Sequence, residues 1–553
     1  MVSRILTAIQ KKYTSVTEAA FIISFFTFMS QLLGVIRDRL FAYYIGPGQD
    51  LDVYLAAFRV PDFLYIILST LISATVLIPL LAKDESETER KRINTLFSVF
   101  LMCVIVLSVL TMLLMPLIAR LVAPGFSSIQ TDKLILLSRI MLISPIMLGI
   151  SNFIGSINQY YKKFFAYATA PVMYNLGIIF GIIFFYRYFG LFGLGLGVIM
   201  GGLLHLLTQL LAYRSSPYTL TLTKVKDMSV ITDVLRVSIP RTVTLSLSSL
   251  LLLILTAIAS FLGPGSISLM TFALNIAFVP LGLIGIPFAT ASFPYLVSLF
   301  KEKNPSVNLV IEATLEKIIF WTSILVTLFI IYRAHIVRII LGTELFSWED
   351  TAITAALVLI FSIGILFQAV NHLFIRVYYA KNNTRKPLLI SFIGFFITLL
   401  LLYLIKFTPP NVLSQAMVDL LRLITRENTQ IILVAFVYTI GMGVTTCLFL
   451  YHYIKDHKHP ILKFFLKCVL VSIGHAFVLG ALCKIFLYLF QNFAKTKTLI
   501  GVVVQSGLSF SIAVILWFIY LFVVKNEHTH YISLKIKSIF SSHKIILEET
   551  QDL

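Results

Sequence analysis

The stretch LGVIRDRLFAYYIGPGQDLDVYLAAFRVPD, residues 33–62, contains the turn on which the organisation of the chain depends. Its centre, Gly46-Pro47-Gly48, occurs again as Gly263-Pro264-Gly265, 217 residues later. Glycine and proline are common where membrane helices end, but further matches follow in the same order at nearly the same separation. They pair Val60-Pro61 with Val279-Pro280, Ala74-Thr75 and Pro79 with Ala289-Thr290 and Pro294, and Tyr160-Tyr161 and Pro171 with Tyr378-Tyr379 and Pro387. The shared order predicts an internal repeat.

The composition excludes a soluble globular enzyme. Hydrophobic residues make up 58% of the 553 residues and charged residues only 12%, and the mean hydropathy is +0.94. Such a chain has lipid as its main solvent. In hydrocarbon the backbone must satisfy its own hydrogen bonds, and long apolar runs do so as helices. We therefore predict an all-α integral membrane protein.

Apolar runs of roughly 20 residues, enough to cross about 30 Å of hydrocarbon, predict fourteen transmembrane helices. They lie near residues 19–45, 51–82, 93–122, 133–157, 164–189, 190–213, 233–262, 266–300, 310–332, 351–379, 387–406, 428–454, 463–490 and 499–524. Each repeat holds six helices, an even number, so both halves enter the membrane in the same direction, with a binding site between them. We predict an N-terminal six-helix lobe at 1–225, a C-terminal six-helix lobe at 226–458, an appended helix pair at 459–525 and a tail at 526–553.

The distribution of positive charge predicts the orientation. The net charge is +19, but the 44 Lys and Arg are dispersed over short loops, which argues against a nucleic-acid partner. Alternate loops, including 83–92, 301–303 and 455–467, hold most of them. The positive-inside rule places these loops and both termini in the cytoplasm. The first residues lack a small-residue cleavage site, so we expect no cleaved signal peptide.

Charged side chains within the first two spans are the strongest candidates for a site. A charge at the membrane centre costs roughly 2.5 to 3.5 kcal/mol, so it faces a cavity or a partner. Arg37 and Arg59 suit a phosphate, because a guanidinium binds it with two hydrogen bonds and keeps its charge. We assign both to a cationic, substrate-binding pocket. We assign Arg39 and Asp62 to a structural cluster at the outer interface, where such side chains reach water.

Further residues of the same stretch could shape this pocket. Gly34 lies where the first helix can bend, and Pro61 interrupts the second helix. Asp38 or Asp52 could hold Arg37 without fully neutralising the pocket.

The second half offers fewer charged candidates. Arg241 follows Pro240 near the start of its first helix and is the candidate cavity charge there. Amides and single histidines within spans predict hydrogen bonds between helices. The sequence contains no nucleotide loop, metal-binding helix motif or catalytic constellation, so we expect no enzyme, metal or cofactor. Four cysteines lie in apolar stretches without metal-ligand spacing and are predicted to be packing residues: Cys103, Cys447, Cys468 and Cys483.

Several of these segments together resemble the MurJ (MviN) lipid II flippases of the multidrug/oligosaccharidyl-lipid/polysaccharide exporter superfamily. The resemblance rests on residues 33–38, 57–62 and 122–126, and on the run from Arg376 to Ala380. It implies a fourteen-helix, V-shaped fold with alternating access around a cationic cavity for the diphosphate and sugar of an undecaprenyl-linked peptidoglycan precursor. It also implies a bacterial inner-membrane protein whose partners are that substrate and membrane lipids; we expect a monomer.

The resemblance assigns roles to individual residues and also shows departures. It implies that Arg37 binds substrate and that Asp52 is a functionally sensitive acid, and it places Arg376 in a late motif with a structural or gating role. Family arginines are replaced at three positions, Gln31, Tyr65 and Asn275, and Phe278 stands where a companion acid is usual. We keep Gln31 and Asn275 as candidate substrate contacts, although the head-group contacts must differ.

The resulting hypothesis is a flippase that carries lipid II from the cytoplasmic to the outer leaflet. The lost arginines favour one alternative, an exporter of another polyprenyl-diphosphate-linked oligosaccharide. A membrane-embedded transferase and a scaffold for envelope assembly are alternatives from other classes. The later spans contain no mid-membrane carboxylate for a coupling cation, so we expect the membrane potential to drive transport.

Overall fold

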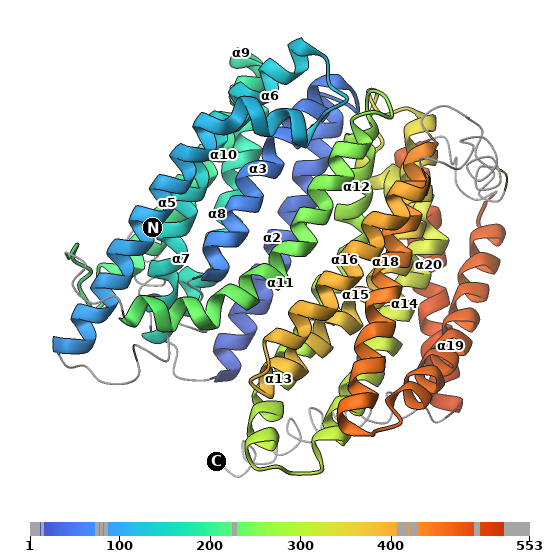
Figure 1. Ribbon diagram of the computed structural model, residues 1–553. Helices are drawn as coiled ribbons and strands as arrows, with labels where there is room; N and C mark the ends of the chain where they lie inside the picture. The colour runs from blue at the N-terminus through green and yellow to red at the C-terminus, as the bar shows by residue number, and fades with distance from the viewer. Residues whose placement is uncertain are drawn as a thin grey trace, which may run out of the picture.

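The structure is a computed structural model, which describes residue 12 and residues 16–71, 77, 81, 87–223, 229–405, 419, 429–491 and 498–524. The described residues form helices joined by short turns (Figure 1). The N-terminal bundle consists of α2 (Val16–Tyr44), α3 (Gln49–Leu71), α5 (Glu87–Val122), α6 (Ser128–Met141), α7 (Ile143–Tyr160), α8 (Phe164–Phe180), η1 (Gly181–Phe185), α9 (Tyr186–Phe189) and α10 (Leu191–Tyr213). The C-terminal bundle consists of α11 (Ser229–Ala259), α12 (Ser266–Ala277), η2 (Leu281–Gly285), α13 (Ile286–Lys301), α14 (Val307–Leu341), α15 (Trp348–Ala380), α16 (Arg385–Ile405) and α18 (Gln430–His457). Two further helices, α19 (Ile461–Leu489) and α20 (Leu499–Val523), follow.

Thirteen segments of the described chain are long and apolar enough to cross a membrane. The fourteenth predicted span is α3, which is less apolar because it carries Asp50, Asp52, Arg59 and Asp62. It nevertheless runs among the other spans (Figure 1). The prediction of an all-α membrane protein with about fourteen spans is therefore confirmed. Most of residues 72–82, the end of the predicted second span, and the predicted tail at 526–553 lie outside the described residues.

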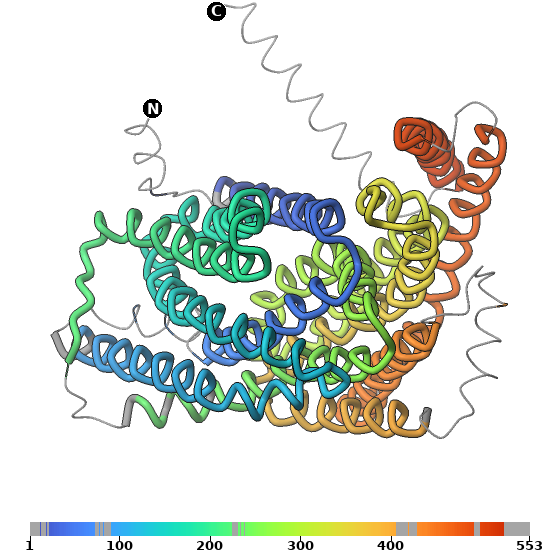
Figure 2. Tube along the Cα trace, turned by 90° about the horizontal axis from the view of Figure 1, so that it is seen from above, coloured from blue at the N-terminus to red at the C-terminus, as the bar shows by residue number. Residues whose placement is uncertain are grey.

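Seen from above, the N-terminal helices gather on one side and the C-terminal helices on the other (Figure 2). The helix α11 lies along the boundary, because it packs against α3 and α5 as well as against α16. The pair α19 and α20 packs against α14 at the edge of the C-terminal bundle, where the Trp517 indole nitrogen donates to the His475 carbonyl oxygen at 3.1 Å. The pair is therefore appended to one bundle.

Glycines explain the close crossing of α8 and α10 in the N-terminal bundle. A Cβ atom on Gly177 would lie 2.3 Å from the Gly201 Cα, and one on Gly181 would lie 2.4 Å from the Gly197 Cα. Small residues four apart on each helix thus let the two backbones touch, as is common between membrane helices. This contact accounts for the glycine-rich span at 190–213.

The repeated Gly-Pro-Gly turns lie at the same end of the molecule and join the two bundles there. Gly46 and Gly263 both have positive φ, at 74° and 101°, a conformation that favours glycine. A Cβ atom on Gly46 would lie 2.9 Å from the Cβ of Leu345 in the other bundle. In the nearby loop after α5, the Gly125 nitrogen donates to the Ser260 hydroxyl at 2.9 Å. We call this the turn end of the molecule.

The cysteine prediction is correct for two residues and wrong for two. Cys468 and Cys483 are buried between helices, whereas Cys103 and Cys447 are exposed. Both exposed residues lie on apolar helices, where a thiol can face lipid as readily as a protein neighbour.

Candidate functional site

A cavity of about 210 Å³ lies between the two bundles, enclosed by α2, α3 and α12. Its charged and amide lining consists of Arg37, Asp38, Arg59, Asp62 and Asn275. A second cavity of about 300 Å³ shares Arg37 and Asp62 with it and extends into the N-terminal bundle. We call the two together the central cavity.

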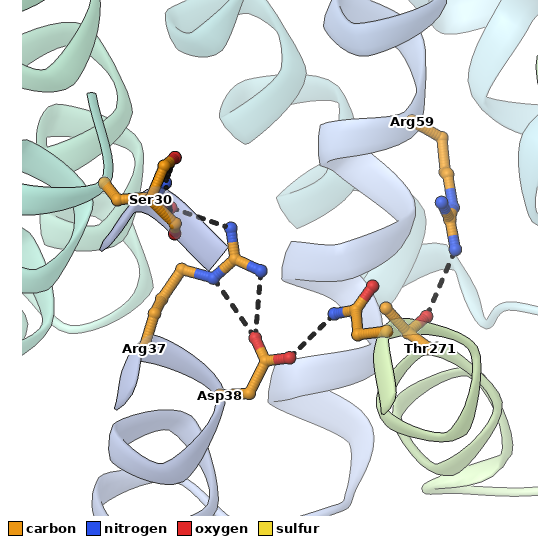
Figure 3. Close-up of polar contacts among 7 residues, drawn as sticks. Ser30, Arg37, Asp38, Arg59 and Thr271 are labelled. Carbon is orange, nitrogen blue, oxygen red and sulfur yellow. Dashed lines mark hydrogen bonds and ion pairs between the residues drawn. The ribbon is translucent and has the colours of Figure 1, made fainter. Parts of the chain in front are cut away.

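Arg37 is held in a chain of polar side chains that crosses from one bundle to the other (Figure 3). Its Nε and Nη2 atoms donate to Asp38 Oδ1 at 3.1 and 2.9 Å, and Nη1 donates to Asn175 Oδ1 at 3.5 Å. The other Asp38 oxygen accepts from the Asn275 amide at 2.8 Å. The guanidinium fork is thus oriented by a carboxylate, as a phosphate-binding arginine needs, but that carboxylate also competes with any anion.

Among the residues that the structure describes, Arg59 has only neutral hydrogen-bond partners. Its Nε atom donates to the Thr256 hydroxyl of α11 at 3.1 Å, and Nη2 donates to the Thr271 hydroxyl of α12 at 3.2 Å (Figure 3). Hydroxyl groups orient the guanidinium without cancelling its charge. Arg59 can therefore exchange these partners for a phosphate at lower cost than Arg37, which must leave a carboxylate.

Asp62 lines both parts of the central cavity and lies within electrostatic range of Arg59 and Arg37. Its carboxylate forms no hydrogen bond or ion pair in the described part of the chain. The prediction that Asp62 belongs to a structural cluster at the outer interface is wrong, because helix α3 turns it inward. With two arginines and two aspartates, the cavity is balanced in charge rather than strongly cationic.

Asp52 lies at the turn end, away from the residues that line the cavity. The carboxylate is 2% exposed and accepts hydrogen bonds from the backbone nitrogens of Gly265 at 2.7 Å and Ser268 at 2.8 Å. The Ser268 hydroxyl adds a bond of 2.5 Å. An acid of α3 thus caps the N-terminus of α12 in the other bundle, where unpaired N–H groups and the helix dipole favour negative charge.

Arg39 also joins the bundles, which fits its assignment as a structural residue, although its guanidinium is directed at the other bundle rather than outward. Its Nη1 atom donates to the carbonyl oxygens of Ile339 and Ile340 at 2.6 and 3.2 Å. These carbonyls belong to the last turn of α14, where they have no partner within the helix. A cation is favoured at this end of a helix dipole.

The remaining candidates lie apart from the cavity lining. Gln31 packs against η2, where a Cβ atom on Gly282 would come within 2.4 Å of its amide nitrogen. Arg241 lies over the ring of Tyr379 in the C-terminal bundle, with 5.3 Å between the guanidinium carbon and the ring centroid. Helix α2 runs unbroken through Gly34, and α3 continues through Pro61.

The structure therefore brings together Arg37, Arg59 and Asn275 among the predicted substrate contacts, and places Gln31, Asp52 and Arg241 elsewhere. No sequence signal links Asn175 with Arg37, which are 138 residues apart. None pairs Arg59 with two threonines of the other bundle. These partners arise from helix packing and carry no local motif.

A charged cavity between two bundles of membrane-spanning helices is typical of a membrane transporter. A model of the family described as "Lipid II flippase MurJ" matches residues 41–505. The chain belongs to this family, which confirms the resemblance inferred from its motifs.

Known relatives and solved structures agree with this assignment. A probable lipid II flippase MurJ of Borreliella burgdorferi is 27% identical over 377 residues, which cover 66% of this chain and 73% of the relative. One of Aquifex aeolicus is 26% identical, covering 69% and 76%. A solved lipid II flippase MurJ in an inward closed conformation has a TM-score of 0.70 at 22% identity, covering 92% of this chain and all of that one. An inward-facing MATE family transporter has the same fold, with a TM-score of 0.61 at 14% identity, covering 79% and 98%.

Proposed function

We propose that this chain flips lipid II, the undecaprenyl-diphosphate-linked peptidoglycan precursor, from the cytoplasmic to the outer leaflet. The observation that carries the proposal is the placement of Arg37 and Arg59 in a buried cavity between the two bundles. A diphosphate needs such guanidinium groups when it leaves water. Relatives named as probable lipid II flippases supply the substrate class.

The transport step follows from where the bundles touch. We place the turn end on the outer side, because the loops richest in Lys and Arg lie at the other end and the positive-inside rule puts these in the cytoplasm. The contacts of Asp52 and Arg39 then close the outer side. Breaking them would open the cavity outward, with residues 1–225 and 226–458 as the moving bodies.

Complementation tests the proposal. A strain depleted of its own lipid II flippase should grow when it expresses this chain, and proteoliposomes with the purified protein should move lipid II between leaflets. Growth failure despite normal amounts of protein in the membrane, together with no lipid II movement in vesicles, would refute the proposal.

One second candidate has a specific observation in its favour. The central cavity carries two arginines balanced by two aspartates, and three positions where family arginines are expected hold Gln31, Tyr65 and Asn275. An exporter of another polyprenyl-diphosphate-linked oligosaccharide is compatible with this less positive cavity. Such a protein would flip a peptide-free lipid-linked oligosaccharide faster than lipid II in the same vesicles.

A further inference from the structure

A second group of polar side chains, two of them arginines, lies outside the central cavity, in the C-terminal bundle. It consists of Arg241 on α11 and of His372, Arg376 and Tyr379 on α15. The Arg241 guanidinium lies 5.3 Å from the centroid of the Tyr379 ring. Tyr379 is within electrostatic range of both arginines, and His372 is within range of Arg376. We call these four residues the C-bundle cluster.

The cluster lacks a counter-ion within the described part of the chain. No carboxylate there forms an ion pair with Arg241 or Arg376. The Nε atom of Arg241 is buried and has no hydrogen-bond partner among the described residues. An unpaired buried donor is costly. An anion that reached Arg241 and Arg376 would supply the missing hydrogen-bond partner and a counter-charge.

The cluster borders a separate cavity, which His372 lines directly. Arg241, Thr244 and Ser248 lie on one side of α11, at spacings of three and four residues, and the latter two line a cavity of about 70 Å³. On α15, His372 lines the same cavity and Arg376 follows one turn later. The interior offers hydroxyl and amide groups from α15 and α16. It suits a small, polar group that ends in a negative charge, and its volume is enough for a carboxylate and a few water molecules.

Helix α11 sets the distance between the two arginine sites. Thr256, which orients Arg59, and Arg241 lie on the same helix, fifteen residues apart. At 1.5 Å per residue this separation is about 22 Å. A peptide of five residues spans at most about 17 Å when extended, and the sugar that joins the peptide of lipid II to its diphosphate adds several ångströms. The peptide stem can therefore reach the cluster while the diphosphate lies at Arg59.

We infer that the C-bundle cluster is a second anion subsite, in which Arg241 and Arg376 bind a carboxylate of the peptide stem. The inference rests on the proposed function and deepens it. The central cavity holds the diphosphate, which every polyprenyl-diphosphate carrier shares. The C-bundle cluster recognises the feature that distinguishes lipid II from a carrier with a neutral oligosaccharide.

Binding of two lipids to the full-length protein in detergent tests the inference. One is lipid II with its complete peptide, and the other is the same undecaprenyl-diphosphate disaccharide without the peptide. The double variant R241Q/R376Q should weaken binding of the complete lipid at least about tenfold, the usual effect of losing a charge-assisted contact. It should leave binding of the peptide-free lipid unchanged. R241K/R376K, which keeps both charges but not the paired hydrogen bonds, should lose less of the preference for the complete lipid than R241Q/R376Q.

Two control variants separate the possible failures. R385Q removes an exposed arginine at the same end of the bundle and should change neither affinity. R37A should weaken the binding of both lipids, because it removes a contact with the diphosphate. The subsite does not exist if R241Q/R376Q weakens the binding of both lipids equally, or of neither, while R37A weakens the binding of both. This conclusion requires that the melting temperatures of the variants are unchanged. A wild-type protein that binds neither lipid would instead refute the proposed function, and this inference with it.

Discussion

The Asp52 carboxylate of α3 accepts two hydrogen bonds from Ser268 of α12, one from its backbone nitrogen and one from its hydroxyl. The two residues are 216 positions apart and belong to different bundles. Because the carboxylate is buried, no water can replace these bonds while the turn end is closed. The pair is therefore a link that must be broken and remade each time the bundles separate.

Replacing Asp52 with asparagine should weaken this link. The NH₂ group of asparagine is a hydrogen-bond donor, and it would face the backbone N–H of Gly265 or of Ser268, which is also a donor. One buried N–H group would then have no acceptor. We expect the free energy of unfolding to fall by about 1–3 kcal/mol and growth in complementation to be strongly reduced. Thermal melting in detergent and the growth assay measure the two effects. Asp50→Asn is the matched control, because Asp50 is exposed and its ion pair within the described residues is with Lys133; equal effects of both variants would contradict the assigned role.

Arg37→Ala should reduce lipid II movement in proteoliposomes at least tenfold, because a diphosphate loses its guanidinium contact. Arg37→Lys should also be impaired, since an ammonium group cannot make the paired hydrogen bonds. The loss of Arg37 also leaves Asp38 with a single amide partner, so the double variant R37A/D38N is needed to separate the two effects. Normal transport by Arg37→Ala would refute a role in binding the diphosphate.

Arg39→Ala should act on stability rather than on substrate binding. The variant leaves the Ile339 and Ile340 carbonyls without a donor, which we expect to lower the free energy of unfolding by about 1–3 kcal/mol. Its affinity for lipid II in detergent should stay within about twofold of the wild type. Arg187→Ala, at an exposed arginine, serves as the control. A large loss of lipid affinity at unchanged melting temperature would contradict this expectation.

Asp62→Asn should strengthen the binding of the diphosphate. The carboxylate lies within electrostatic range of both cavity arginines and has no hydrogen bond within the described residues. Removing its negative charge makes the electrostatic potential of the cavity more positive, which favours an anion. We expect the affinity for the peptide-free lipid to rise several-fold, with little change in melting temperature. Asp38→Asn should behave differently, because Asp38 orients Arg37. Weaker binding by Asp62→Asn would show that Asp62 helps to hold the arginines in place.

Transport should follow the membrane potential and require no sodium gradient. The carboxylates of the central cavity, Asp38 and Asp62, lie beside arginines, an arrangement unsuited to a metal cation. Moving an anionic diphosphate out of a negative interior gains about 2.3 kcal/mol per charge per 100 mV. Proteoliposomes in which the potential and the sodium gradient are set independently provide the measurement. Strict dependence on sodium would instead indicate a cation site outside the central cavity.

The fold was predictable because its signals are local, whereas much of the site was not. A run of apolar residues specifies a spanning helix wherever it occurs, and the repeated Gly-Pro-Gly turn specifies how the halves are related. The direction of a side chain depends on which helix packs beside it. Arg39 and Asp62 were both assigned a structural role at the outer interface. Arg39 has a structural role, because it caps α14 in the other bundle, whereas Asp62 enters the cavity. The partners of Arg39 lie about 300 residues away in the sequence. The direction of Asp62 depends on how α3 is rotated about its own axis.

The crossing of α8 and α10 has a consequence for how the molecule can move. Helices that slide past each other do so by shear, in which interlocking side chains change rotamers and repack. The backbone of α10 touches α8 at Gly177 and Gly201 and touches η1 at Gly181 and Gly197, so no layer of side chains lies between them to be rearranged. We expect these segments to move as a rigid block. The contact between α3 and α11 is different, because it includes side chains such as Arg59 and Thr256, which can exchange partners.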